Sequence, residues 1–307
     1  MNYTLQLPEG LQIIAKNELN EVPERVQEDI AYIRRWLLKQ PHIHARLDDA
    51  TLLMHLRGCK FSLEKTKRKL EVSHAIKSAF PNVFRNRDPL LPNLQCILKQ
   101  NIVAVLPETS NGPLWVLFRI ENATPETLSV SDFIKLSTIV TDVTLRECIS
   151  SSIAGRAVLL DLKNMSPGFF TLITPTTIKQ YITCHLNVYP LRLKAIHLIN
   201  FPTILVPLMN LFKKLIGHKL GNRVILYSAE NTVTRYLPLS ILPSEFGGTG
   251  EPFVNICEKL RTKIESYRDW LIEDEQYGCD ESKRPATSIV DIDLFSIDGS
   301  FRKINVD

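Results

Sequence analysis

The chain lacks the sequence features of several large protein classes. It has six cysteines in 307 residues, and none stands in a Cys-x-x-Cys pair or beside a histidine at ligand spacing. We therefore expect no metal site, no disulfide framework and a reducing compartment. No uninterrupted apolar run reaches the roughly 18 residues of a membrane span, and the first residues lack a basic region followed by an apolar one. A cytoplasmic protein that neither crosses a bilayer nor enters the secretory route is expected.

Charge excess and catalytic motifs are also missing. The formal net charge is only +4, far from the basic excess of nucleic-acid-binding proteins. There is no Gly-x-Ser-x-Gly motif. Ser62 and Lys65 fit a Ser-x-x-Lys pattern, but they lie at a charged helix start without companion motifs, where helix capping is the better explanation. We expect no catalysis, no cofactor, no nucleic-acid partner and a monomer.

The first 80 residues have the pattern of a small helical domain. Val22 to Lys39 carries apolar residues at spacings of three and four with charges on the other face, which predicts an amphipathic helix. A second helix begins near Asp48 and Asp49, which are suitable N-cap residues. A third runs from Ser62 to Ile76, with Ser62 starting a box-like cap.

From Pro81 the pattern changes to strands alternating with helices. Short, largely apolar runs predict five strands: Ile102–Leu106, Leu114–Ile120, Ala157–Leu162, Ala195–Ile199 and Val224–Tyr227. Helices are predicted at Ser131–Ser150, Pro175–Asn187, Pro202–Leu220 and Val254–Leu271. The alternation predicts an α/β domain, residues 81–272, with a mostly parallel five-stranded sheet under helical cover. A polar tail, residues 273–307, is expected to be partly ordered at best.

One predicted helix departs from an ordinary α/β domain. Pro202–Leu220 has almost no polar face over its first three turns, so it must be covered on nearly all sides. It is either a central core helix or a lid, with one face over a lipid-filled cavity and the other exposed or in a membrane interface, and Pro207 loosening the backbone. Basic residues flank it: Arg192, Lys194, Lys213, Lys214, His218, Lys219 and Arg223. Apolar insertion beside a basic cluster favours the lid, whereas a solvated charged face is the alternative.

Several blocks of sequence carry a family resemblance. Ile196–Pro202, the apolar helix after it and the run Ile241–Gly248 resemble the C-terminal half of a CRAL-TRIO lipid-binding domain. His55–Phe61 resembles the helical N-terminal signature of that family, and Gly155–Asp161 its central strand. The resemblance spans residues 20–265 and is nearest to the animal branch with the α-tocopherol transfer protein and the retinaldehyde-binding protein.

The resemblance implies a lipid pocket, a mobile lid helix over it and a basic cleft. Carried over position by position, the pocket lining falls on Phe133, Val140, Leu160, Ile173, Tyr181, Cys184, His185, Tyr189, Leu191, Ile196, Leu208, Leu211 and Phe212. The phosphoinositide contacts fall on Arg57, Arg192, Lys194, Lys219 and Arg223. The implied function is extraction of a hydrophobic lipid from one membrane and delivery to another, with transient peripheral docking on anionic phosphoinositides.

The cargo is narrowed by one departure from the family. Leu191 stands where phosphatidylinositol carriers of the yeast type have Glu, so a neutral tocopherol, retinoid, carotenoid or similar isoprenoid is favoured over an internal phosphoinositide. Tyr181, Cys184 and His185 differ in size or polarity from the tocopherol protein and leave the cargo open. The alternatives are a phospholipid transfer protein, a lipid-sensing signalling module and a lipid hydrolase.

Overall fold

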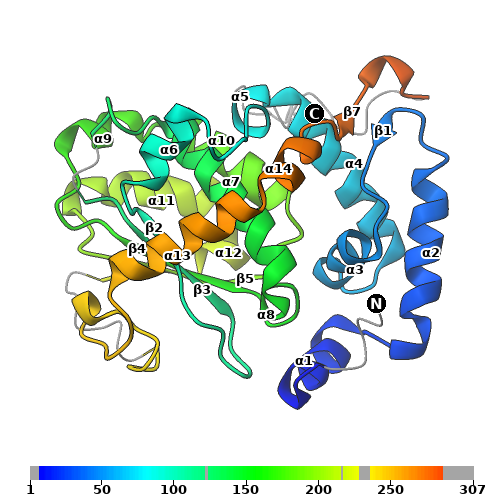
Figure 1. The fold of residues 1–307 in the computed structure, drawn as a ribbon, viewed down its shortest axis with the longest axis horizontal. Coiled ribbons are helices and arrows are strands. Elements are labelled where there is room, and N and C mark those ends of the chain that lie inside the picture. Colours follow the sequence, from blue (N-terminus) through cyan, green and yellow to red (C-terminus); the bar gives the residue numbers. More distant parts are fainter. Residues whose placement is uncertain (1–6, 122–123, 216, 228–235, 286–307) are drawn as a thin grey trace, which may run out of the picture.

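The computed structural model describes residues 7–121, 124–215, 217–227 and 236–285. Within these ranges the protein is a mixed α/β structure with a helical N-terminal part, as predicted (Figure 1). A five-stranded sheet lies at the centre of the larger part, and its strands follow the order β2-β3-β4-β5-β6.

The N-terminal part consists of four main helices. They are α1 (Glu9–Leu19), α2 (Val26–Leu37), α3 (Asp49–Gly58) and α4 (Leu63–Ala79). Asp48 caps α3 as predicted, since its side chain accepts the Thr51 N–H at 3.0 Å. Ser62 precedes α4 without a side-chain cap bond, so the predicted cap there is wrong. Helix α1 was not predicted.

The five predicted strands are confirmed with boundaries shifted by one or two residues. They are β2 (Val103–Val105), β3 (Leu114–Arg119), β4 (Arg156–Asp161), β5 (Leu193–Ile199) and β6 (Val224–Leu226). Strand β2 runs antiparallel to β3, and the pairs β3–β4, β4–β5 and β5–β6 are parallel. The prediction of a mostly parallel sheet therefore holds.

The two faces of the sheet pack against different helices, because side chains alternate along each strand. Trp115, Leu117 and Leu159 pack with the apolar side of α13 (Phe253–Ser266), which crosses the sheet in Figure 1. Val116 and Phe118, on the other face, share a core with α7 (Val130–Glu147). The second face is the one that carries the site described below.

Shorter helices complete the larger part. They are α5 (Pro81–Phe84), α6 (Pro92–Leu98), α8 (Ile149–Ile153), α9 (Pro167–Leu172), α10 (Pro175–Ile182) with a π turn at Thr183–Asn187, and α14 (Arg268–Asp274).

The predicted single helix Pro202–Leu220 is divided. A 3-10 turn at Thr203–Leu205 leads into α11 (Val206–Leu215), and α12 (His218–Gly221) follows Gly217, which has a φ of 79°. That left-handed φ favours glycine and ends the continuous helix. Pro207 lies in the first turn of α11, where a missing N–H costs no helical bond, so the predicted loosening of the helix by this proline is wrong.

The predicted tail is tied to the N-terminal part as far as residue 285. Strand β7 (Gly278–Cys279) pairs antiparallel with β1 (Ile43–His44). Asp274 forms ion pairs with Arg46 at 3.1 Å, Lys77 at 2.8 Å and Arg87 at 3.3 Å. Residues 286–307 lie outside the described part. Since these contacts cross both predicted boundaries, the division at residues 80 and 272 stays a prediction.

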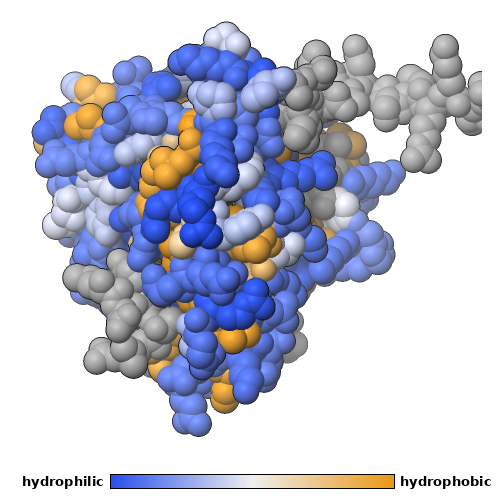
Figure 2. Space-filling model, turned by 90° about the vertical axis from the view of Figure 1, so that its right-hand side faces the viewer, coloured by the Kyte–Doolittle hydropathy of each residue, from blue (hydrophilic) through white to orange (hydrophobic). Residues whose placement is uncertain are grey.

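The outer surface of the N-terminal helices is mainly hydrophilic. Figure 2 shows this side of the molecule, where apolar residues form small patches separated by hydrophilic ones. Of the described helices, none is long and apolar enough to cross a bilayer.

Candidate functional site

An apolar cavity of about 270 Å³ lies between the sheet and its helical cover. Its floor is made by the side chains of β3, β4 and β5 that point away from α13, among them Val116, Val158 and Ile196. Helices α7, α9, α10 and α11 form the walls and the roof. An apolar space of this kind suits a hydrophobic small molecule.

Helix α11 and the turn before it separate this cavity from the outside. Leu205, Leu208, Met209 and Phe212 line the cavity, whereas Ile204 is 76% exposed and Val206 is 38% exposed. The same apolar stretch thus contacts the cavity on one side and the outside on the other. This is the arrangement of a lid and not of a central core helix, the other interpretation that the sequence allowed.

Most of the predicted pocket residues meet at this cavity. The lining includes Phe133, Val140, Leu160, Ile173, Tyr181, His185, Leu191, Ile196, Leu208 and Phe212. These positions come from β4, β5, α7, α10 and α11 and from the segments between them, and the fold brings them together around one space.

Three predicted pocket residues are not part of the lining that the structure describes. Cys184 is fully buried in a separate cluster with Val188 and Tyr189, because it lies on the far side of the turn that presents Tyr181 and His185. The Tyr189 hydroxyl donates to Asp142 Oδ2 at 2.8 Å and lines another pocket. Leu211 is only partly buried on α11.

The prediction missed a polar group at the cavity wall. Arg156, at the start of β4, lines the cavity together with the hydroxyl groups of Ser137 and Thr141 on α7. Beside them the Tyr181 and His185 rings stack with centroids 4.2 Å apart. Burial raises the pKa of Tyr181 to about 12 and lowers the pKa of His185 to about 4, so both are neutral at neutral pH. The available sequence signal was an arginine directly before the apolar run Ala157–Leu160.

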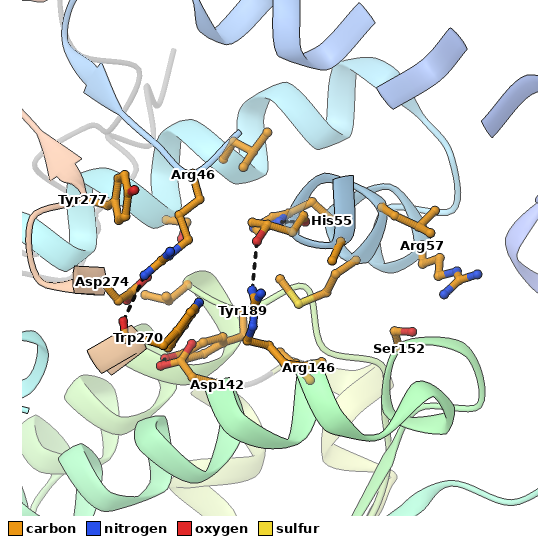
Figure 3. Close-up of a pocket in the computed structure, with 18 of the residues that line it drawn as sticks. Arg46, His55, Arg57, Asp142, Arg146, Ser152, Tyr189, Trp270, Asp274 and Tyr277 are labelled. Carbon is orange, nitrogen blue, oxygen red and sulfur yellow. Dashed lines mark hydrogen bonds and ion pairs between the residues drawn. The ribbon is translucent and has the colours of Figure 1, made fainter. Parts of the chain in front are cut away.

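A second cavity, of about 380 Å³, lies between the N-terminal helices and the larger part. Figure 3 shows Arg46 and His55 on one side of it and Asp142, Arg146 and Tyr189 on the other. Its charges are largely matched within the protein: Arg46 pairs with Asp274 at 3.1 Å, and Arg146 lies 3.9 Å from Asp48. Ion pairs across this cavity join the two parts. Its lining mixes these charged groups with apolar side chains such as Leu53 and Met54, so it is far less apolar than the first cavity.

The predicted basic residues divide into two groups. Arg192 and Lys194 both pair with Glu18 of α1, the lysine at 3.0 Å, and these hydrogen bonds lower the pKa of the Glu18 carboxyl. Arg223 donates to the Leu193 carbonyl oxygen, and Lys219 is exposed on α12. Arg192 and Lys194 lie just before and within β5, whereas Lys219 lies in α12 and Arg223 directly precedes β6, the strand that pairs with β5.

Arg57 does not belong with them. It is 4% exposed and makes a bidentate ion pair with Glu21, with N–O distances of 2.9 and 2.8 Å. A buried guanidinium whose Nε and Nη2 both donate to a carboxylate is not available to a headgroup. The assignment of Arg57 to the phosphoinositide cleft is therefore corrected, because the resemblance gave the residue type but not its partner.

Among the described residues, no group of histidine, cysteine and acidic side chains is arranged to hold a metal ion.

Comparison with known proteins agrees with this architecture. Residues 22–94 match the Pinta-like UBA domain family, and residues 98–248 match the CRAL/TRIO domain family. The chain is 31% identical to the Homo sapiens protein named Alpha-tocopherol transfer protein-like over 253 residues, 80% of this chain and 72% of that protein. It is 27% identical to Clavesin-1 of Rattus norvegicus over 242 residues, 78% of this chain and 68% of that protein.

Among solved structures, the crystal structure of Sfh5 aligns with a TM-score of 0.47 and 13% identity, over 81% of this chain and 91% of that one. This likeness is too weak to add to the assignment. The sequence matches over most of the chain show that the protein belongs to the CRAL-TRIO family of lipid-binding and lipid-transfer proteins.

Proposed function

We propose that the protein binds one isoprenoid-sized lipid, such as a tocopherol, retinoid or carotenoid, in the apolar cavity and carries it between membranes. The supporting observation is the apolar space between the sheet and α11, which is lined almost wholly by hydrophobic side chains. A lipid of this size hides about 500 Å² of apolar surface, worth about 12 kcal/mol at roughly 25 cal/mol per Å². Such a cargo leaves a membrane only into an equally dry container, which the sheet and the roof provide.

Membrane docking is assigned to the four cations Arg192, Lys194, Lys219 and Arg223. Each basic side chain near an anionic surface contributes about 1 kcal/mol, which is enough together for reversible attachment. The exposed apolar residue Ile204 lies before α11, and could enter the interface while the cations contact phosphoinositides. The protein is then cytoplasmic with transient membrane contact, and opening of α11 is favoured only if the open state binds the membrane more tightly.

Glu18 occupies part of this surface. Its carboxylate contacts both Arg192 and Lys194, in the way that a headgroup phosphate would. Docking through these two cations therefore requires that Glu18 be displaced, and α1 acts as an internal competitor.

A carrier is favoured over the hydrolase alternative by the polar groups in the cavity. Ser137 Oγ and His185 Nε2 both lack a hydrogen-bond partner, so they are not joined as a nucleophile and its base. We propose that the cavity stores its cargo unchanged.

The test combines cargo identification with a transfer assay. Lipids extracted from the purified full chain are identified by mass spectrometry, and transfer of that lipid is timed between donor vesicles and acceptor vesicles that contain phosphoinositide. We expect Lys219→Ala/Arg223→Ala to slow transfer with cargo affinity nearly unchanged. Lys259→Ala/Lys263→Ala removes the same charge from α13, on the other face of the sheet, and serves as the control. No lipid in the cavity, or equal transfer by both double variants, argues against the proposal.

A further inference from the structure

Arg156 is the one charged side chain among the residues that line the apolar cavity. It is 4% exposed and opens β4, where Val158 and Leu160 follow it on the cavity side of the strand. Strands that face an apolar core normally carry only apolar side chains at such positions. The guanidinium therefore stands at one end of a row of hydrophobic groups.

The hydrogen-bond partners of this guanidinium are neutral. Its Nη1 donates to Thr141 Oγ1 at 2.8 Å, and its Nη2 donates to Thr144 Oγ1 and, at 3.3 Å, to Ser151 Oγ. Within residues 7–121, 124–215, 217–227 and 236–285, no carboxylate forms an ion pair with Arg156. Asp142, beside Thr141 on α7, instead forms an ion pair with Arg87 at 2.5 Å and accepts a hydrogen bond from the Tyr189 hydroxyl at 2.8 Å.

A buried guanidinium without a counterion is an unfavourable arrangement, because hydroxyl dipoles compensate only part of its lost hydration. Burial lowers the pKa of Arg156 to about 10, which still leaves it charged at neutral pH. Its Nε–H is buried and has no acceptor. An anion in the cavity would provide both the missing charge and the missing acceptor.

Two other buried groups at this end of the cavity lack partners. Ser137 Oγ and His185 Nε2 are unbonded, both residues are lining residues, and they are 3% and 6% exposed. Ser137, Thr141 and Thr144 follow at spacings of four and three, so they share one side of α7. Arg156 also acts on His185, since its charge contributes to the lowered pKa of that ring. One end of the otherwise apolar cavity is therefore bordered by a small group of buried polar side chains.

We propose that the cavity takes a lipid carboxylic acid, bound as its carboxylate against Arg156 Nε and the Ser137 hydroxyl, with its tail under α11. The inference rests on the proposed function, that the cavity holds a lipid, and it replaces the expectation of a neutral headgroup. A carboxylate carries the single negative charge that one guanidinium balances, whereas a phosphate monoester carries more. An alcohol is the competing headgroup, since it could bridge Arg156 Nε–H and His185 Nε2, but it would leave the cation unneutralised.

The test compares two retinoids that differ only at the headgroup. All-trans-retinoic acid and all-trans-retinol are titrated into delipidated full chain, with α-tocopherol as a third ligand. We expect the acid to bind about tenfold more tightly than the alcohol, as a charge-assisted hydrogen bond in a dry site allows. In Arg156→Met this preference is lost because affinity for the acid falls more than affinity for the alcohol, while Arg156→Lys keeps part of the preference.

The Arg156→Met variant is suited to this test. Thr141 and Thr144 still donate to the Ser137 and Val140 carbonyl oxygens, so removal of the arginine leaves their hydroxyls bonded. A second measurement needs no variant. Carboxyl-labelled retinoic acid bound to the unmodified chain is followed by 13C NMR, and Arg156 is expected to keep the carboxylate ionised from about pH 8 down to about pH 5.

The outcomes separate the two proposals. Binding of retinol or tocopherol as tightly as the acid, an acid preference that survives Arg156→Met, or a bound acid that is protonated at neutral pH overturns the inference and leaves the carrier function standing. Failure of all three ligands to bind the folded chain overturns both.

Discussion

Glu18→Gln should tighten the binding of this protein to anionic membranes. In the structure the Glu18 carboxylate contacts Arg192 and Lys194, two of the four cations assigned to docking. The Glu18 side chain is 45% exposed, so its ion pairs are worth no more than about 1 kcal/mol. A membrane must displace the carboxylate before it gains these two cations. Removing this cost of about 1 kcal/mol corresponds to roughly fivefold tighter binding.

The assay is co-sedimentation with vesicles, with phosphoinositide-containing and neutral vesicles compared at fixed salt. Glu9→Gln is the matched control, because it makes the same charge change at an exposed position of the same helix. A fivefold gain for Glu18→Gln on anionic vesicles alone supports the displacement. If the two variants bind alike, or if the gain is equal on neutral vesicles, the role assigned to Glu18 is wrong.

Three further predictions follow from the structure. In the segment over the cavity, Leu208→Ala lowers cargo affinity because it removes a contact with the cavity. Ile204→Asp leaves cargo affinity unchanged and slows transfer between vesicles, because Ile204 is 76% exposed. Equal effects of the two variants on cargo affinity would contradict this. Arg87→Met leaves the buried carboxylates of Asp142 and Asp274 without this cation. Denaturant titrations should show that the free energy of unfolding falls by about 3 to 5 kcal/mol. A loss below about 1 kcal/mol would show that these ion pairs are dispensable. Burial lowers the pKa of His55 to about 3 and that of His74 to about 4. The unfolded chain therefore binds more protons than the folded chain below about pH 6.5, and each histidine lowers the free energy of unfolding by about 2 kcal/mol at pH 5. Denaturation midpoints that do not change between about pH 6.5 and pH 5 would refute this assignment.

The larger part of the fold was predictable because its strands and helices alternate in sequence. Each strand of the sheet coincides with a short, largely apolar run, and parallel pairing follows from the helices between the runs. The contact between β1 and β7 could not be predicted, since it joins two-residue strands from opposite ends of the chain and neither has a pattern of its own. Helix α1 had a usable signal in Leu11, Ala15 and Leu19, which are buried at spacings of four.

The site was predicted less completely than the fold, for physical reasons. A resemblance transfers residue types, and it placed Phe133, Leu208 and Phe212 at the cavity. It does not transfer the interaction partners of a residue, so it could not show that Arg57 is buried in an ion pair with Glu21. Arg156 was missed because the predicted strand began at Ala157, and only the structure extends β4 to residue 156 and places this arginine at the cavity.

Hydrogen exchange over α11 tests the central claim most directly. Amide exchange of residues 206–215 is measured in the full chain without lipid, with the co-purified lipid restored, and with that lipid and phosphoinositide vesicles together. If α11 covers the cargo, lipid slows exchange in this helix and the vesicles speed it again, while the amides of β4 stay protected throughout. Exchange in α11 that responds to neither lipid nor vesicles would contradict its role as the cover of the cavity.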